Sequence, residues 1–384
     1  MAKTSPALDT PLGDQLERLA AYESQGVPVV SLYLNLTADQ HGRNNHDAFV
    51  RKAFAEHLKA FKGNSAEHAS LERDHERIRE YLADEVNRAA NGLALFSSAG
   101  SGEFFEAIQL EAPLDEHWFF VGSVPHLYPL ARIIDQYPRY ASVLLDTHRA
   151  RIFVFALNAV ERRHEITSAK TRRTAMGGWS QARYQRHADN LHLHHVKEVI
   201  DTLERIVRQD NIQHIIVAGD DVVVPLIKDQ LPKHLEEKLV DVLALQRNAA
   251  EDEIIESTLE VLRHKEAETD ADRVQELIGA WQSAGLGVIG SEDTLKALRL
   301  GQVDELLISA EPDQLDVIQL PDDAAPGHVT AQTSAPSRAD ERKLKLADEL
   351  VTRAKQTAAR VRFIEDPALL KSFGGVGALL RFRI

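Results

Sequence analysis

Two glycines and a glutamine in the middle of the chain, Gly177, Gly178 and Gln181, are residues whose types and spacing suggest chemistry. Glycine allows backbone angles that a Cβ forbids, so the backbone can approach a ligand closely. A loop with such a tip is suited to reaching into a phosphate-rich cavity. An ordinary surface turn explains the same glycines, so the residues around them must decide between the two interpretations.

Basic residues surround the glycine pair. The stretch 162–187 carries seven Lys or Arg residues against one acid, Glu165, although the whole chain has a formal net charge of −14. Cationic side chains neutralise phosphates and release counterions from nucleic acid. The candidates for such RNA contacts are Lys170, Arg172, Arg173, Arg183 and Arg186. Trp179 is a candidate for stacking on a nucleobase, and we interpret the whole stretch as a basic loop suited to a phosphate-rich cavity.

The remaining composition limits the class of protein. With 384 residues the chain is expected to form two or three domains. It contains no cysteine, which excludes disulfides and thiolate chemistry and fits a reducing cytoplasm. No apolar run approaches the roughly 18 residues of a membrane span, and the N-terminus lacks a signal-peptide pattern. We therefore expect a soluble, cytoplasmic protein with no membrane partner.

Acidic residues are concentrated away from the basic stretch. Residues 236–276 contain thirteen Asp or Glu against five Lys or Arg. Solvated helix faces are the preferred explanation of such a run, and a surface turned toward a protein partner is the alternative. The acidic total argues against general coating of nucleic acid but leaves room for one local basic contact.

Apolar strand patterns alternate with helical patterns, which predicts an α/β protein of three domains in series. The first domain, 1–136, contains a strand at 29–34, charged helices at about 47–62 and 66–90, and an apolar run at 93–96. The middle domain, 137–267, contains strands at 142–146, 150–155 and 212–218 and an amphipathic helix from Leu193 onward. The basic loop lies between the second of these strands and the helix.

The third domain, 268–384, reads as a compact α/β unit with one insertion. Residues 320–338 are rich in Pro, Ala, Ser and Thr, which predicts a flexible insertion. Gly374 and Gly375 predict a tight corner before the last strand.

Other candidate sites have less support. Zinc would need two ligands beyond His192 and His195, and no cysteine or His-Glu-x-x-His pattern supplies them. We therefore expect no metal site, and we expect the histidines of 187–195 to be solvated or to face RNA. Asp220 and Asp221 follow a predicted strand and are explained by helix capping. No phosphate-binding glycine motif or nucleophile elbow is present, so we expect no cofactor, no nucleotide hydrolysis and no serine chemistry.

Two segments near the C-terminus resemble a known family. Residues 290–298 read Gly-Ser-Glu-Asp-Thr-Leu-Lys-Ala-Leu and resemble a signature in the last domain of archaeal and eukaryotic class I release factors. Residues 373–382, Phe-Gly-Gly-Val-Gly-Ala-Leu-Leu-Arg-Phe, are similar to the same family's ending. The resemblance covers roughly 140–384 and is weaker in the first domain. It implies a bacterial member of this superfamily, related to Pelota-, Vms- and Balon-type proteins, with a release-factor or Pelota-like architecture.

The resemblance implies a role for the glycine pair. In release factors a Gly-Gly-Gln loop enters the peptidyl-transferase centre and helps water attack the peptidyl-tRNA ester, so Gly177, Gly178 and Gln181 are the implied catalytic residues. The present sequence reads Gly-Gly-Trp-Ser-Gln, with two residues between the glycines and the glutamine. The Asn-Ile-Lys-Ser element associated with stop-codon reading is absent from 1–136. The last domain implies a translational GTPase partner.

Three functions stay open from the sequence. The first is a factor that binds the ribosomal A site, contacts rRNA and tRNA, and hydrolyses peptidyl-tRNA without a stop codon. The second is a non-catalytic hibernation or recycling factor of Balon or Pelota type at the same site. The third is a protein that acts on tRNA or another RNA away from the ribosome. Whether the protein is an enzyme depends on which of these holds.

Overall fold

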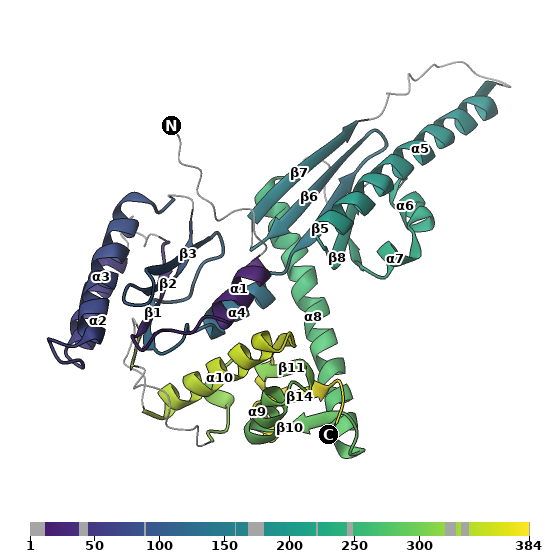
Figure 1. Ribbon diagram of the computed structural model, residues 1–384. Helices are drawn as coiled ribbons and strands as arrows, with labels where there is room; N and C mark the ends of the chain where they lie inside the picture. The colour runs from purple at the N-terminus through teal and green to yellow at the C-terminus, as the bar shows by residue number, and fades with distance from the viewer. Residues whose placement is uncertain are drawn as a thin grey trace. The chain divides into compact units, whose positions relative to one another are not determined.

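The computed structural model describes residues 12–37, 45–87, 90–157, 159–167, 180–219, 222–243, 249–318, 328–331 and 338–383 (Figure 1). For 180–189, 328–331 and 338 only the backbone is described. The chain divides into two compact units. The terminal unit comprises Met1–Gln136 and Thr269–Ile384, and the middle unit comprises Tyr137–Glu268.

Three sheets, together with the helices between their strands, confirm the prediction of an α/β protein. The first sheet belongs to the terminal unit and has the order β12-β4-β1-β2-β3. Its strands are β1 (Val29–Asn35), β2 (Gly92–Ser98), β3 (Phe104–Leu110), β4 (Trp118–Gly122) and β12 (His328–Ala331). All its pairings are antiparallel.

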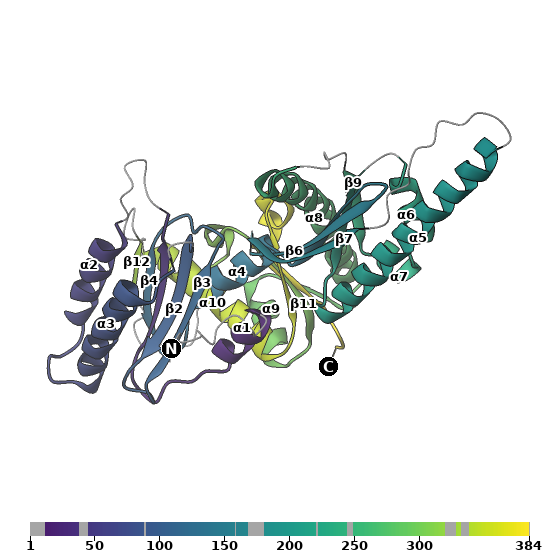
Figure 2. The ribbon, with the colours of Figure 1, turned by 90° about the horizontal axis from the view of Figure 1, so that it is seen from above.

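Helices α2 (His46–Leu58) and α3 (Ala66–Asp84) cover one face of this first sheet (Figure 2). Alternate residues of β1 point toward them, because side chains along a strand alternate between the two faces. Val30, Leu32 and Leu34 are fully buried against Phe54 of α2 and its neighbours. The helical patterns predicted at 47–62 and 66–90 therefore correspond to α2 and α3.

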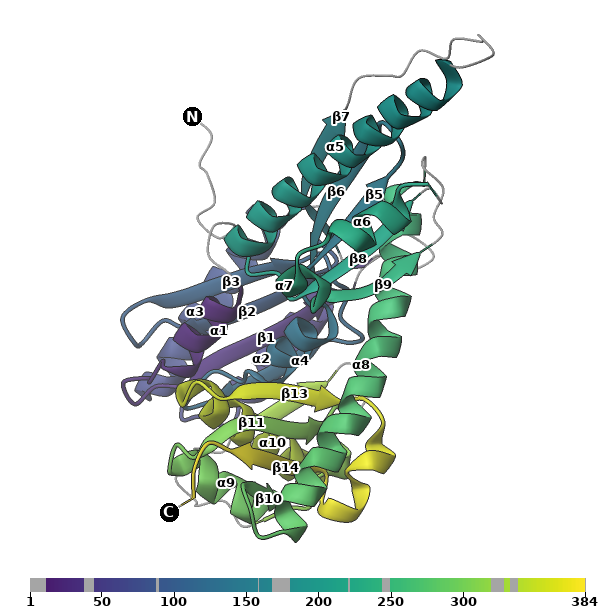
Figure 3. The same cartoon turned by 90° about the vertical axis from the view of Figure 1, so that its right-hand side faces the viewer.

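The third sheet, also in the terminal unit, has the order β10-β14-β11-β13 (Figure 3). Its strands are β10 (Gly287–Ile289), β11 (Val303–Ser309), β13 (Arg360–Ile364) and β14 (Val376–Leu380). Helices α9 (Ser291–Arg299), α10 (Arg338–Gln356) and α8 (Glu251–Gln282) accompany it, and α8 crosses the boundary between the two units. Gly374 and Gly375 have φ of 73° and 76°, which confirms the predicted corner before β14.

Helix α4 (Tyr128–Gln136), with α1 (Leu12–Ala20) nearby, joins the first and third sheet regions into one unit. The Asp348 carboxylate of α10 accepts the backbone N–H groups of Leu127 at 2.6 Å and Tyr128 at 3.1 Å. These N–H groups lie at the start of α4, so Asp348 caps that helix from another region of the chain. At the other end of α4, Asp135 accepts the N–H of Phe363 in β13 at 3.0 Å.

Strand β12 adds a second link within the terminal unit. It lies inside 320–338, the segment predicted as a flexible insertion, and it pairs antiparallel with β4 of the first sheet. The pairing runs from His328 opposite Val121 to Ala331 opposite Trp118. Sequence patterns could not predict this strand, because its four residues pair with a partner about 200 positions away.

The middle unit contains the second sheet, of order β7-β6-β5-β8-β9. Its strands are β5 (Tyr140–Leu145), β6 (Arg149–Ala156), β7 (Ala159–Thr167), β8 (His214–Gly219) and β9 (Leu239–Leu243). Strands β5, β8 and β9 are parallel, whereas β6 and β7 run antiparallel to their neighbours. Short helices α6 (Val224–Gln230) and α7 (Lys233–Glu236) lie between β8 and β9.

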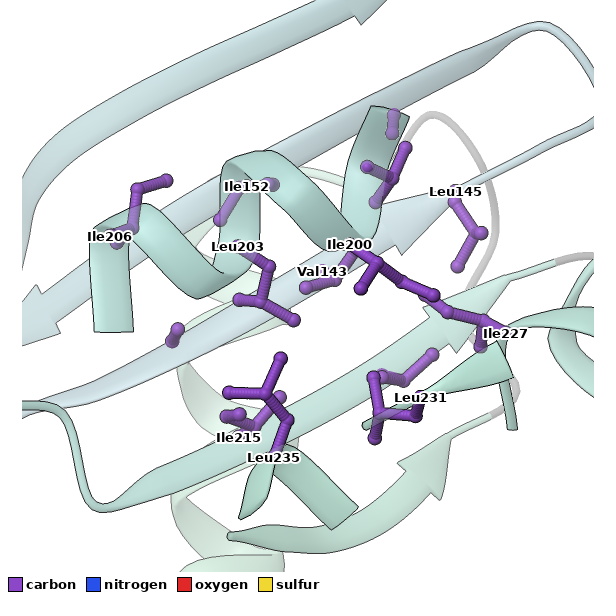
Figure 4. Packing of buried hydrophobic residues seen from close by; sticks show 14 of the residues in the cluster. Val143, Leu145, Ile152, Ile200, Leu203, Ile206, Ile215, Ile227, Leu231 and Leu235 are labelled. Carbon is purple, nitrogen blue, oxygen red and sulfur yellow. The ribbon is translucent and has the colours of Figure 1, made fainter. Parts of the chain in front are cut away.

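Helix α5 (Ser180–Gln209) packs on one face of the middle sheet. Figure 4 shows Ile200, Leu203 and Ile206 of this helix among residues of the sheet and of α6 and α7. Among the described side chains of α5, those in this core lie from Val196 onward. The opposite face of the sheet packs against the first half of α8, where the Tyr140 hydroxyl lies 2.7 Å from that of Thr258. The middle sheet is therefore covered on both faces.

We predict that Asp348→Ala destabilises the terminal unit by about 2–4 kcal/mol, because two buried N–H groups and His126 lose their shared partner. Urea unfolding measures the change. Arg342→Ala on the exposed face of α10 is the matched control. Equal midpoints for the two variants would show that the Asp348 cap does not hold the unit together.

Candidate functional site

Most of the predicted site residues lie outside the described part of the chain. Gly177, Gly178, Trp179, Lys170, Arg172 and Arg173 fall within 168–179, which the structure does not describe. Gln181, Arg183 and Arg186 lie in the first two turns of α5, where the backbone alone is described. The catalytic and RNA-binding roles of these residues stay predictions.

The prediction of one basic loop over 162–187 is wrong at both ends. Strand β7 continues to Thr167 and helix α5 begins at Ser180, so only 168–179 separates the two elements. The helix starts thirteen residues before the predicted start at Leu193. Residues such as Gln181, Ala182 and Arg183 favour helix by intrinsic propensity. The predicted start at Leu193 was based on apolar periodicity, which detects helix faces that pack on a core. It does not detect helix propensity, so residues 180–192 were missed.

Two arginines of the basic stretch are engaged within the middle unit. Arg162 forms an ion pair with the buried Asp210 at 2.9 Å, and Arg163 forms one with Glu251 at the start of α8. Both arginines belong to β7 and not to a loop. They therefore do not count toward an RNA contact. Between Glu165 and Asp189 the sequence still contains five basic residues and no acid.

Two of these five bases, Arg183 and Arg186, belong to helix α5. Among the described side chains of α5, those in the apolar core start at Val196, sixteen residues after Ser180, so roughly 24 Å of helix precede that residue. Figures 1 and 3 show the start of α5 extending past the ends of β6 and β7. We call residues 180–191 the stalk. Segment 168–179 is therefore joined to the sheet by β7 on one side and by the stalk on the other.

A fixed turn lies at the root of the stalk. It joins β5 to β6, and we call its residues 146–149 the root turn. The Asp146 carboxylate accepts the N–H groups of His148 at 2.7 Å and Arg149 at 2.8 Å. The Asp146 N–H donates to the Arg149 carbonyl at 2.8 Å. These bonds hold the root turn in one backbone conformation.

Two histidines of α5 contact the root turn. The buried His195 is hydrogen-bonded to the backbone of Arg149, and the ring of His192 lies 6.2 Å from that of His148. Burial lowers the pKa of His195, while the bond to Arg149 partly opposes that shift. The expectation of solvated or RNA-facing imidazoles is therefore wrong for His195, because this side chain fastens α5 to the turn.

The parallel strands β5 and β8 meet closely at the same end of the sheet. A Cβ built on Gly219 would lie 2.2 Å from the Leu145 carbonyl oxygen, so only glycine fits here without movement. Asp220 and Asp221, predicted as helix-capping residues, lie outside the described residues. Among the described residues, no three His, Cys, Asp or Glu side chains gather in an arrangement that could hold a metal ion.

The sequence interpretation missed the root turn. Asp146 was assigned to the end of the predicted strand 142–146, and Thr147, His148 and Arg149 appeared only as a polar connection to the next strand. An aspartate that begins a short polar connection is a known signal for side chain to backbone bonding. Its proximity to the histidines of α5 depends on packing across more than forty residues, which no local pattern reveals.

Comparisons with known proteins agree with this architecture. Residues 125–263 match the model of bacterial archaeo-eukaryotic release factor family 10, and residues 266–384 match the model of eRF1 domain 3. The chain belongs to the archaeo-eukaryotic release factor superfamily. It is thus a protein of the translation-factor type, as the C-terminal motifs predicted.

Relatives in this superfamily align over nearly the whole chain. Peptide chain release factor subunit 1 of Thermococcus kodakarensis is 23% identical over 411 residues, which cover 97% of each chain. Eukaryotic peptide chain release factor subunit 1-3 of Arabidopsis thaliana is 22% identical over 90% of this chain and 96% of its own.

Solved structures of the superfamily cover similar lengths at lower identity. The crystal structure of the archaeal termination factor aRF1 is 17% identical over 97% of both chains, with a TM-score of 0.26. Archaeal Pelota, from a model with ABCE1 on the ribosome, is 14% identical over 100% of this chain and 99% of its own, with a TM-score of 0.44. None of the helices formed by the described residues has the length and apolar character that crossing a bilayer requires.

We predict that Asp146→Ala loosens the root turn, because the N–H groups of His148 and Arg149 lose their acceptor. The expected loss of stability in the middle unit is about 1–2 kcal/mol. Amide hydrogen exchange at the two positions, together with urea unfolding, measures the effect. Asp201→Ala, at an exposed position of α5, is the control and should change neither. Unchanged exchange at both amides would refute this role of Asp146.

Proposed function

We propose that the protein binds the A site of the ribosome and inserts segment 168–179 toward the peptidyl-transferase centre. There it hydrolyses peptidyl-tRNA independently of a stop codon, as a rescue factor acting in the cytoplasm. The observation that carries this proposal is the stalk, a helix joined directly to a basic segment that contains a glycine pair. Membership of the release factor superfamily supports it.

The charge of the segment and the stalk fits an RNA-lined cavity. Residues 166–188 combine five basic side chains with no acid, inside a protein of formal net charge −14. The overall negative charge disfavours binding to RNA at random, while the local positive charge favours one contact. A rigid helix lowers the entropic cost of placing that contact inside a cavity.

The position of Gln181 suits a role in catalysis. It lies in the first turn of α5, where backbone N–H groups have no intrahelical partner and the helix dipole favours negative charge. In the proposed mechanism the Gln181 amide orients the attacking water. Gly177 and Gly178 let a backbone N–H approach the ester, and that N–H stabilises the developing oxyanion.

A specific observation also favours a second function. Two residues, Trp179 and Ser180, separate the glycine pair from Gln181, and the glutamine belongs to a helix. In a non-catalytic factor of hibernation or recycling type the same segment would occupy the site without cleaving the ester. The superfamily resemblance of 268–384 to eRF1 domain 3 further supports a translational GTPase as partner in either function.

We predict that purified protein releases peptide from ribosome-bound peptidyl-tRNA and that Gln181→Ala slows release by about 10²–10³-fold, as for loss of one oxyanion-stabilising donor. Single-turnover release of labelled peptide measures the rate. Gln185→Ala, about one turn further along α5, is the matched control. Equal rates for parent and Gln181→Ala would refute the hydrolase assignment. Stable ribosome binding without any release would assign the non-catalytic function.

We also predict that ribosome binding weakens steeply with salt. Replacing Arg172, Arg173 and Arg183 together by Ala should lower the slope of log affinity against log salt by about two to three, because three phosphate contacts are lost. Cosedimentation at several salt concentrations measures the slope. The control replaces Arg205, Arg208 and Lys233, which are exposed elsewhere in the middle unit. The same slope for both triple variants would count against the basic segment as the contact.

A further inference from the structure

The root turn and the start of segment 168–179 lie at the same end of the middle sheet. In the pairing of β6 with β7, Arg149 is opposite Thr167, the last residue of β7. Segment 168–179 begins directly after Thr167. RNA that contacts the start of the segment therefore lies near Arg149, provided that the segment enters RNA as proposed.

The root turn holds Arg149 in place from two sides. Its N–H donates to the Asp146 carboxylate, and its carbonyl accepts from the Asp146 N–H and bonds to the His195 ring. The Asp146 side chain is itself buried, with 8% of the residue exposed, and its carboxylate accepts two backbone N–H groups. The backbone of Arg149 is fixed, and the charge of Asp146 is turned inward.

The hydrogen bonds that hold the root turn involve the backbone of Arg149 and not its side chain. It is exposed, and no ion pair connects it to an acid among the residues that the structure describes. The next arginine on the same face differs, because Arg151 donates to the Ala249 carbonyl and lies 5.4 Å from the Phe153 ring centre. Arg151 thus packs on the body of the unit, whereas Arg149 is exposed and its backbone is held by hydrogen bonds.

We propose that Arg149 is a phosphate contact at the root of the stalk, which binds the sugar–phosphate backbone of RNA at the entrance of the cavity that segment 168–179 enters. This inference rests on the proposed function. A guanidinium presents a planar set of donors that matches phosphate oxygens, and its rigid base lowers the entropy lost on binding.

The distance from Arg149 to the start of α5 indicates what this contact does. His192, which lies beside the root turn, is twelve residues from Ser180, so the start of α5 is about 18 Å from the contact. Phosphate contacts fix the register and orientation of a protein on nucleic acid. A contact at the root of the stalk therefore limits how deeply the segment is inserted.

Binding to purified ribosomes at several salt concentrations tests the charge. Arg149→Ala should lower affinity by about tenfold and reduce the slope of log affinity against log salt by about one. Arg149→Lys keeps the charge and should keep the parent slope. Arg205→Ala, at an exposed position in the second half of α5, is the matched control and should change neither. If Arg149→Ala binds like Arg205→Ala while the parent binds normally, the inference fails and the proposed function stands.

A second measurement identifies the partner as RNA. The chain contains no cysteine, so Thr147→Cys provides a single attachment point for an iron chelate that cleaves nearby RNA by hydroxyl radicals. We expect cuts in ribosomal RNA from Thr147→Cys and different or no cuts from Arg208→Cys. Loss of affinity in Arg149→Ala without cuts from Thr147→Cys would indicate an acidic ribosomal protein and overturn the RNA contact. Absence of ribosome binding by the parent would contradict the proposed function itself.

Discussion

Helix α5 is held to the middle sheet by apolar side chains of its second half. Val196, Val199, Leu203 and their neighbours are buried against the strands, and among the described side chains of this helix those in the apolar core start at Val196. Burying a Val, Leu or Ile side chain stabilises by about 1.5–3 kcal/mol, so this stripe fixes the direction of the whole helix. The backbone of the first half of α5 continues in that direction. The point where the stripe begins thereby sets the length of the stalk.

The basic residues also differ between the packed part of the middle unit and the stalk. Arginines that precede the basic segment, Arg162 and Arg163, pair with acids of the middle unit and stabilise the fold. Those in 168–187 lie on the segment and the stalk, where the neighbouring sequence offers no acid. An exposed Arg149 at the root extends the basic surface toward the sheet. Within one basic stretch, some arginines thus stabilise the fold, and others are candidates for binding RNA.

The sequence predicted those elements whose own residues carry a packing pattern. Strands β1, β5 and β6 were recognised because their apolar residues lie consecutively or alternate, and α3 because its charged pattern is long. Strand β7 was missed because it is an edge strand, with exposed residues at most positions between Ala159 and Thr167. The first half of α5 was missed because its sequence has helix propensity without an apolar stripe.

Contacts between distant segments could not be predicted. The cap that Asp348 provides for α4, the pairing of β12 with β4 and the bond between His195 and the root turn each join positions far apart in the sequence. At the candidate site, the sequence predicted a basic segment around the glycine pair. The stalk and the root turn were recognised only in the structure. The glycine pair and Gln181 depend on the family resemblance, because local patterns do not distinguish a catalytic loop from a turn.

Cryo-electron microscopy of ribosomes bound to the tagged protein tests most directly whether the stalk carries a probe into ribosomal RNA. We predict density for α5 in the A site, with segment 168–179 among rRNA phosphates beside the end of the peptidyl-tRNA. Density for the protein elsewhere on the ribosome, or in the A site with the stalk directed away from RNA, would contradict this central claim.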